Sequence, residues 1–150
     1  MDSAAPRQGP FWDGMLGRTS QPPAAQTLGL RFVDADSDSG TIDLAFTARA
    51  EWTNPFGNVL GAFVAAMLYD TVGPTLLATL DPEKFQSTEE FSVRFLRPLR
   101  PGPVTAHGRV VDRSGATAEL AATLYDADGP AATATATARV IDVADAPDAV

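Results

Sequence analysis

Asp70 is the residue of this chain whose type and position most clearly suggest chemistry. It is the only acid between Val59 and Leu80, in a segment that is otherwise mostly small and apolar. An isolated carboxylate in an apolar segment is costly unless it is paired or functional, and perturbed carboxylates cluster at functional sites. The structural alternative is that Asp70 caps or hydrogen-bonds a helix that Pro74 breaks. We favour a functional carboxylate.

Other reactive groups are few. The sequence has no cysteine, which excludes disulfides, thiolate zinc sites and a cysteine nucleophile. His107 is the sole histidine and alternates with Thr105 and Arg109 along a predicted strand, so we expect it at solvent or at a sheet edge. No nucleophile motif accompanies it, and one histidine without cysteine does not make a zinc site. We therefore expect no Ser-His-Asp triad, no metal and no cofactor.

Composition limits the partners. The 150 residues carry a net charge of -8, with 45% apolar and 20% charged residues, which is typical of one soluble domain. The acidic balance argues against nucleic acid as a partner. Ten of the eleven basic residues are arginine, whose planar fork binds phosphate at single points, so a phosphorylated small molecule is still compatible. With no visible signal peptide and no run of about 18 apolar residues, we expect a cytoplasmic protein without a membrane span.

One long helix and a set of strands must position these residues. Val59 to Leu80 is apolar nearly all round, which predicts a helix buried on most sides, with a kink or break at Pro74. Alternating or β-rich segments predict strands at 28–36, 41–49, 87–98, 104–113, 115–129 and 130–142. An antiparallel sheet wrapped around one helix satisfies this order and leaves edge strands that favour a dimer. We expect an N-terminal extension with a short helix (1–27), a main domain (28–143) and a disordered tail (144–150).

Three motifs carry a resemblance to a known family. Asn-Pro-Phe-Gly-Asn-Val-Leu-Gly-Ala (54–62) is similar to Asn-x-x-Gly-x-x-His-Gly-Gly, Met-Leu-Tyr-Asp-Thr (67–71) to Leu-Ala-Asp-Thr, and residues 88–102 to Thr, six residues, Phe-Leu-Arg-Pro-x-x-x-Gly. In this order and spacing they resemble the hotdog thioesterases, specifically the PaaI-like acyl-CoA thioesterase group. The resemblance covers roughly residues 28 to 142. It implies an α+β hotdog fold, with an antiparallel sheet of five to six strands wrapped around one long central helix.

The resemblance also implies an activity, the hydrolysis of an acyl-CoA thioester to a free acid and coenzyme A. It makes Asp70 the base or nucleophile, and the backbone N–H of Gly61 the oxyanion hole at the positive end of the helix. Asn54 stands where the family places a water-positioning amide. Thr88 stands where some members carry a hydroxyl that assists from a partner subunit. A homodimer or homotetramer is implied.

Further residues are expected to contact the substrate. An apolar wall beside the helix suggests an aryl or medium-chain acyl group, and an arginine near the end of a strand could contact the phosphates of coenzyme A. The candidates are Tyr69, Leu60, Phe63, Phe56 and Arg97.

The sequence also departs from the family pattern. Leu60 stands at the family's His, and the family acid usually falls nine residues later, which is Tyr69 and not Asp70. One residue is 100° around a helix. Either the backbone near Pro74 turns Asp70 into the site, or the chemistry has changed. A non-catalytic hotdog module that binds acyl-CoA or another apolar ligand is therefore the alternative. A dehydratase or hydratase is disfavoured, because it needs a histidine at or near the helix.

Overall fold

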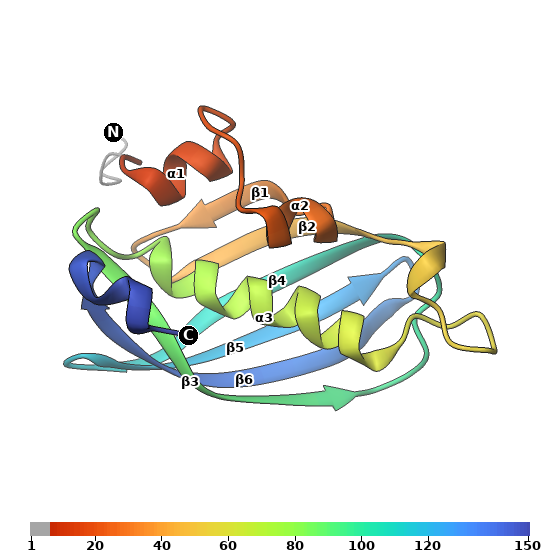
Figure 1. Ribbon diagram of the computed structural model, residues 1–150. Helices are drawn as coiled ribbons and strands as arrows, with labels where there is room; N and C mark the ends of the chain where they lie inside the picture. The colour runs from red at the N-terminus through yellow and green to blue at the C-terminus, as the bar shows by residue number, and fades with distance from the viewer. Residues whose placement is uncertain (1–6) are drawn as a thin grey trace.

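The computed structural model describes residues 7–150, which form one antiparallel sheet and one long helix (Figure 1). In chain order the elements are α1 (Pro10–Met15), α2 (Pro23–Leu28), β1 (Arg31–Asp36), β2 (Thr41–Ala48), η1 (Ala50–Trp52), α3 (Gly61–Leu77), β3 (Lys84–Phe95), β4 (Gly102–Ser114), β5 (Thr117–Asp126), β6 (Gly129–Asp142) and η2 (Val143–Asp148). None of the helices in this part of the chain is long and apolar enough to cross a membrane.

The sheet has six strands in the order β1-β2-β4-β5-β6-β3, and every neighbouring pair is antiparallel. Alternate residues point to its two faces, and one face is buried. On β2, Ile42, Leu44 and Phe46 are all fully buried, as the alternation predicted. The buried face curves around α3 (Figure 1). This arrangement agrees with the predicted sheet around one central helix.

The central helix α3 is 17 residues long and lies against the middle of the sheet, where it contacts β4 and β5 most. A side chain at Gly108 of β4 would place its Cβ 2.0 Å from Thr75 Oγ1, so glycine permits this close approach. The predicted break at Pro74 is not found, because the helix continues to Leu77 and the N–H of Ala78 donates to the Pro74 carbonyl. Pro74 nevertheless offers no N–H to the carbonyl of Asp70.

From residue 7 on, the N-terminal extension contains two short helices, where we expected one. In α1, Trp12 is buried between Phe11 and Phe32, with the Arg7 guanidinium 4.9 Å from its ring centre. The second helix, α2, begins directly after Pro22, with Pro23 as its first residue. Proline favours the first position of a helix because it needs no N–H there. The double proline Pro22–Pro23 therefore marks the start of a helix.

The C-terminal residues lie along β3 as ordered structure, although we expected a disordered tail. The N–H of Val143 donates to the Glu83 carbonyl at 2.9 Å, and the N–H of Thr88 donates to the Val150 carbonyl at 2.9 Å. The N–H of Val150 in turn donates to Ser87 Oγ at 3.2 Å. An edge strand presents unpaired backbone groups. The C-terminal segment satisfies those at the start of β3.

Candidate active site

The N-terminus of α3 presents free backbone donors. Gly61 is the first helical residue, and Leu60 precedes it without a side-chain hydrogen bond. The N–H groups of Phe63 and Val64 both donate to the Leu60 carbonyl. Within residues 7–150, the N–H groups of Gly61 and Ala62 have no acceptor. Two free donors at the positive end of a helix have the chemistry to hold an oxyanion, and the catalytic role of Gly61 stays a prediction.

Space at this helix end is limited by an aromatic ring from β3. A Cβ built on Gly61 would lie 3.2 Å from Cζ of Phe95. Phe95 is nevertheless 57% exposed, and Leu60, which precedes Gly61, is 47% exposed. Phe56, at the tip of the preceding loop, is 82% exposed. The entrance to α3 is therefore apolar and open to solvent.

The Asn54 side chain forms the loop that precedes α3. Its Oδ1 accepts the N–H of Phe56 at 2.9 Å and that of Asn58 at 3.2 Å, an Asx turn. Gly57 completes the turn with a φ of 79°. The oxygen of Asn54 is thus engaged by backbone, and its amide nitrogen is the group that could orient a water. The catalytic role of Asn54 stays a prediction.

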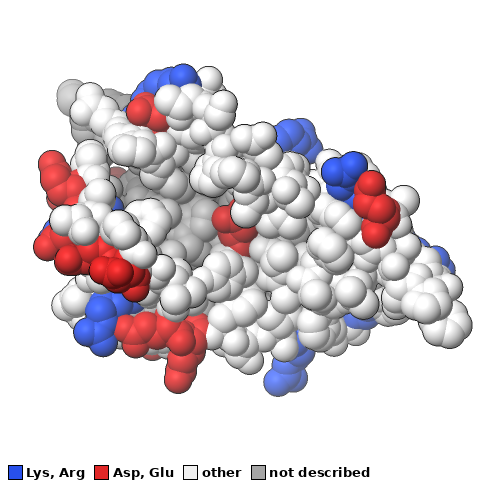
Figure 2. All heavy atoms as spheres, viewed as in Figure 1, with Lys and Arg blue, Asp and Glu red and all other residues white. Residues whose placement is uncertain are grey.

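Asp70 is half-buried near the middle of α3. Among the described residues, its Oδ2 is buried and has no hydrogen-bond partner. Burial raises the pKa of its carboxyl from 3.8 to about 6, because the charged form loses hydration without a compensating partner. Figure 2 shows this face of the molecule, with most charged groups at its rim and one acidic group in the middle beside a hollow. A carboxylate with these properties suits general-base catalysis near neutral pH.

Tyr69 and Asp70 border the open face of α3 on opposite flanks. The ring of Tyr69 packs edge-on against Phe91 of β3, with ring centres 5.2 Å apart. Phe63 lies seven residues before Asp70 and therefore on the same flank as Asp70. Its ring stacks on Trp52, which follows β2, at 4.8 Å between centres. Asp70 thus faces the β2 side, while Tyr69 faces the β3 edge.

Thr88 and Gln86 form a buried polar pair on the inner face of β3. Thr88 is 8% exposed and Gln86 is 7% exposed. Thr88 Oγ1 donates to Gln86 Oε1 at 3.1 Å. Gln86 Nε2 lies 3.0 Å from the position that a Cβ would take on Gly73, so the amide rests on α3 less than one turn beyond Asp70. Within one chain, Thr88 therefore bonds to Gln86, which in turn lies against α3. The catalytic role of Thr88 stays a prediction.

Arg97 holds the β5–β6 hairpin. Its guanidinium donates to both oxygens of Asp126, to the Gly129 carbonyl and, through Nε, to the Pro130 carbonyl at 3.1 Å. These bonds lower the pKa of the Asp126 carboxyl to about 2. Four of the five N–H donors of Arg97 are thus occupied within the fold. Its predicted contact with substrate phosphate would have to compete with these bonds.

The two principal candidates are far apart in one chain. Gly61 and Asp70 are separated by nine positions along α3, which is about 13 Å at the rise of an α-helix. In a productive complex the carbonyl oxygen accepts an N–H at about 3 Å, and the carbonyl carbon lies about 3 Å from the attacking oxygen. The donor nitrogen and the attacking oxygen are then at most roughly 7 Å apart. Gly61 and Asp70 of a single chain therefore cannot serve the same thioester carbonyl.

Two amides near the helix were not recognised in the sequence. Gln86 precedes the motif that contains Thr88, and nothing local signals that it lies on Gly73. Asn58 was not among the predicted site residues, yet its Oδ1 is buried without a partner among the described residues. A glycine within a helix, such as Gly73, is the signal that could have indicated a close contact. Among residues 7–150, no group of three or more histidine, cysteine, aspartate or glutamate side chains could hold a metal ion.

Comparison with known protein families identifies the family to which this chain belongs. The family model described as the acyl-CoA thioesterase N-terminal domain matches residues 49–139. The chain belongs to this family. The predicted relation to the hotdog thioesterases is confirmed, and the chain is a thioester hydrolase. A comparison with curated proteins found no match.

Solved structures of the same fold support the family. A phenylacetic acid degradation-related protein of Ralstonia eutropha JMP134 is 29% identical, with a TM-score of 0.83 over 86% of this chain and 98% of that one. The PaaI protein of the E. coli phenylacetic acid degradation operon is 16% identical, with a TM-score of 0.76 over 87% and 93%. A thioesterase family protein of Silicibacter pomeroyi is 23% identical, with a TM-score of 0.77 over 89% and 99%. The last two, at this identity, show the fold alone.

Proposed function

We propose that this thioesterase hydrolyses acyl-CoA thioesters to a free acid and coenzyme A, with Asp70 as general base or nucleophile. One observation carries the proposal: the half-buried carboxylate of Asp70 has one buried oxygen with no hydrogen-bond partner among the described residues, and its pKa is raised to about 6. Such a carboxylate is ionised and reactive at neutral pH. Family membership favours this enzyme over a non-catalytic hotdog module that only binds acyl-CoA.

The remaining groups take roles that fit their positions. The free N–H groups at Gly61 and Ala62 stabilise the oxyanion that forms when the thioester carbonyl is attacked. The Phe63–Trp52 stack lies on the same flank of α3 as Asp70, about two turns nearer the helix N-terminus, and its apolar surface fits an aryl or medium-chain acyl group. Asn54 keeps the loop before the helix in place and can orient water through its free amide nitrogen.

The active form is a homo-oligomer. Because Gly61 and Asp70 of one chain are about 13 Å apart along the helix, one complete site needs Gly61 from one copy and the carboxylate from another. The free edge of β3 offers a surface for such an assembly. Each homodimer would then contain two equivalent sites.

A panel of acyl-CoA thioesters tests the activity. Short, medium, long and aryl acyl groups are incubated with the full chain, and the free thiol of coenzyme A is measured over time. The proposal expects release that saturates with substrate for at least one acyl class. Binding of acyl-CoA without any release from the whole panel would reject the proposal and leave a binding module.

A further inference from the structure

Gln86 and Thr88 are buried polar side chains that bond to each other. Among the described residues, the other buried polar side chains are Thr71 and Thr75 of α3. Each of these donates its hydroxyl to the carbonyl four residues earlier, at 2.8 and 2.7 Å. Thr88 instead donates to Gln86 Oε1 at 3.1 Å, and Gln86 lies against the central helix. A buried polar pair is costly unless its hydrogen bonds are made, so the groups that this pair leaves unbonded require a partner.

The pair keeps unused hydrogen-bonding groups on both members. Thr88 has one hydroxyl proton, which Gln86 Oε1 accepts, and no donor reaches the lone pairs of Thr88 Oγ1 within residues 7–150. In the same range Gln86 Nε2 has no acceptor, although the side chain as a whole is buried. This nitrogen is not completely covered, so water can reach it. The pair therefore presents an acceptor and a donor to a small polar group that enters beside α3.

The backbone of β3 departs from a regular strand next to this pair. Its register with β6 shifts between Thr88 and Glu90. The extra residue brings Thr88 to the same face of β3 as Phe91, whose ring packs on Tyr69 of α3. Bulges of this kind are frequent next to active sites, where they re-aim a side chain. The Thr88 hydroxyl thus faces the helix because of a local irregularity.

The helix departs from the ordinary at the point where Gln86 meets it. Gly73 lies inside α3, where glycine is less favourable than alanine. A Cβ there would come within 3.0 Å of Gln86 Nε2, so glycine leaves the room that the amide occupies. Gly73 follows Asp70 by three residues, about 4.5 Å along the helix axis. A bulge, a helical glycine and an incompletely bonded polar pair therefore coincide near the proposed base, and such departures from regular structure are expected at functional sites.

We propose that Gln86 is a positioning residue of the thioesterase site. Its amide oxygen takes the proton of Thr88, so the Thr88 hydroxyl meets the reacting groups only as a hydrogen-bond acceptor. A hydroxyl restricted in this way can hold a water molecule by one of its protons, but it cannot donate to the oxyanion or to the departing thiolate. The inference rests on the proposed function and on the predicted role of Thr88, and it adds a residue that lies outside the family motifs.

Because Gln86 acts on the reaction through Thr88, it has a kinetic signature. Without Oε1 the Thr88 hydroxyl rotates and directs its proton elsewhere, so a smaller fraction of the enzyme holds it in the productive orientation. The loss falls on kcat, since substrate binding does not depend on this proton. Once Thr88 lacks its hydroxyl, Gln86 has nothing to orient and its removal no longer matters. Residues that act as a unit show this kind of non-additivity.

A double-mutant cycle on kcat tests the inference. Gln86→Met keeps the length of the side chain and removes the acceptor oxygen, whereas Thr88→Val keeps the shape of threonine and removes the hydroxyl. With the acyl-CoA that the panel identifies, Gln86→Met should lower kcat about ten-fold, with KM within about two-fold of the wild type. Thr88→Val should lower kcat at least as much, and the double variant should stay within about two-fold of Thr88→Val. Melting curves confirm that each variant folds.

Two further variants sharpen the cycle. Gly73→Ala displaces the amide without altering Gln86 itself, so it should reproduce the loss of kcat that depends on the Thr88 hydroxyl, even if Gln86→Met does not fold. Thr88→Ser keeps the hydroxyl. It should stay within about three-fold of the wild type and still lose about ten-fold in kcat when Gln86→Met is added.

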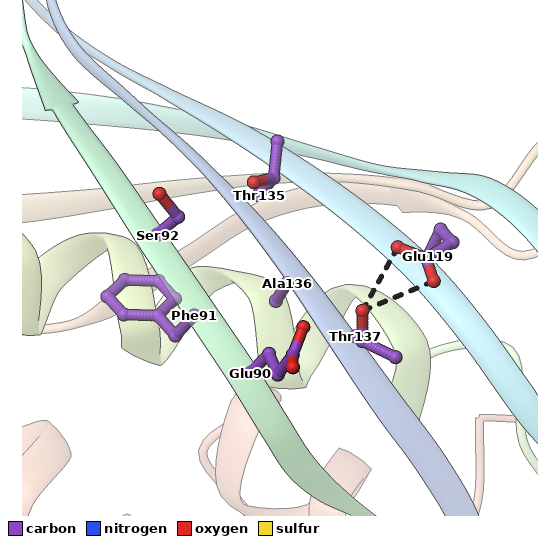
Figure 3. A pocket seen from close by; sticks show the side chains of 7 residues that line it. All are labelled: Glu90, Phe91, Ser92, Glu119, Thr135, Ala136 and Thr137. Atoms are coloured by element: carbon purple, nitrogen blue, oxygen red, sulfur yellow. Dashed lines mark hydrogen bonds between the residues drawn. The ribbon is translucent and has the colours of Figure 1, made fainter.

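The matched control is Thr137→Val, which removes another threonine hydroxyl that bonds to a side chain two strands away from Thr88. Thr137 lies in a groove on the outer face of the sheet, because its neighbours Ala136 and Ala138 are buried on the inner face. Figure 3 shows its hydroxyl bonded to both carboxylate oxygens of Glu119, at 3.1 and 3.2 Å. This change should leave both kcat and KM unchanged.

The outcomes separate this inference from the proposed function. If the wild type releases thiol and Gln86→Met lowers kcat by the same factor with and without the Thr88 hydroxyl, Gln86 acts on the fold alone and the inference is overturned. Wild-type kcat in Gln86→Met or in Thr88→Val overturns it as well, and each of these results leaves the thioesterase activity standing. A wild type that releases no thiol from any substrate rejects the proposed function, and the positioning role with it.

Discussion

Tyr69 and Asp70 are neighbours in the sequence but border opposite flanks of α3. Tyr69 packs on Phe91 at the β3 edge, whereas Asp70 lies on the flank where Phe63 stacks on Trp52. The position that the family pattern gives to its acid is therefore held by a phenol that faces the edge strand. The carboxylate of this chain approaches the open helix face from the other side, so the two residues can be separated by experiment.

Asp70→Asn should lower kcat for acyl-CoA hydrolysis by about 10² to 10⁴-fold, because the amide cannot accept a proton or form an acyl intermediate. Tyr69→Phe keeps the ring on Phe91 and should change kcat by less than about three-fold. Steady-state thiol release is the measurement, with melting curves to confirm that both variants fold. If Tyr69→Phe abolishes turnover while Asp70→Asn retains it, the reactive group is on the β3 flank.

The rate should also follow the ionisation of Asp70. Its pKa is raised to about 6 by burial, so kcat/KM should rise with pH and level off above that value as the free enzyme's base deprotonates. A profile that is flat between pH 5 and pH 8 would exclude Asp70 as the base. The profile is recorded with the acyl-CoA that the panel identifies.

The free energy of unfolding should change with pH in the opposite direction to kcat/KM. The folded pKa of Asp70, about 6, lies above the unfolded value of 3.8. The favourable contribution of the protonated form is therefore complete below about pH 4 and is lost as the pH rises through 6. About two pKa units correspond to roughly 3 kcal/mol. Urea unfolding at fixed protein concentration should show wild type losing up to this amount between pH 4 and pH 7.5 relative to Asp70→Asn. Parallel pH curves for the two proteins would contradict a raised pKa of the half-buried Asp70 carboxyl.

The strands and the long helix could be predicted because their signals are local. The alternation of Ile42, Leu44 and Phe46 gives the buried face of β2 directly. The rotation of α3 about its own axis has no local signal, because it depends on which side of the helix packs on β3 and which on β2. The structure was therefore needed to show on which flank of the helix Tyr69 and Asp70 each lie.

Thr88 shows a second limit. Strict alternation along β3 would place Thr88 and Phe91 on opposite faces, since they are three residues apart. An irregular register between Thr88 and Glu90 inserts one residue and returns both side chains to the inner face. No single residue type in this segment indicates such a bulge. The contact of Gln86 with Gly73 is likewise long-range and has no signal in either segment alone.

Gly73→Ala should displace the Gln86 amide. The added Cβ would lie 3.0 Å from Gln86 Nε2, so the amide must move and its bond to Thr88 is strained. Alanine itself favours the helix by about 1 kcal/mol, so Gly73→Ala alone does not isolate the contact. A double-mutant cycle with Gln86→Ala does isolate it, and the unfolding free energies should show a coupling of about 1 kcal/mol. The double variant should be more stable than the two single changes predict, whereas additive changes would show that Gln86 does not rest on Gly73 in solution.

Arg97→Ala separates a structural arginine from a substrate-binding one. Its guanidinium holds Asp126 and two carbonyls of the hairpin, so the variant should melt at a lower temperature with KM for acyl-CoA unchanged. The loss should be greatest above about pH 4, because the pKa of Asp126 is lowered to about 2 and its stabilising contribution disappears only as the pH falls toward that value. Arg97→Lys keeps the charge but cannot form the paired bonds, and should recover little of the stability. A KM that rises several-fold for acyl-CoA but not for the matching acyl-pantetheine, with melting unchanged, would instead assign Arg97 to the phosphates of coenzyme A.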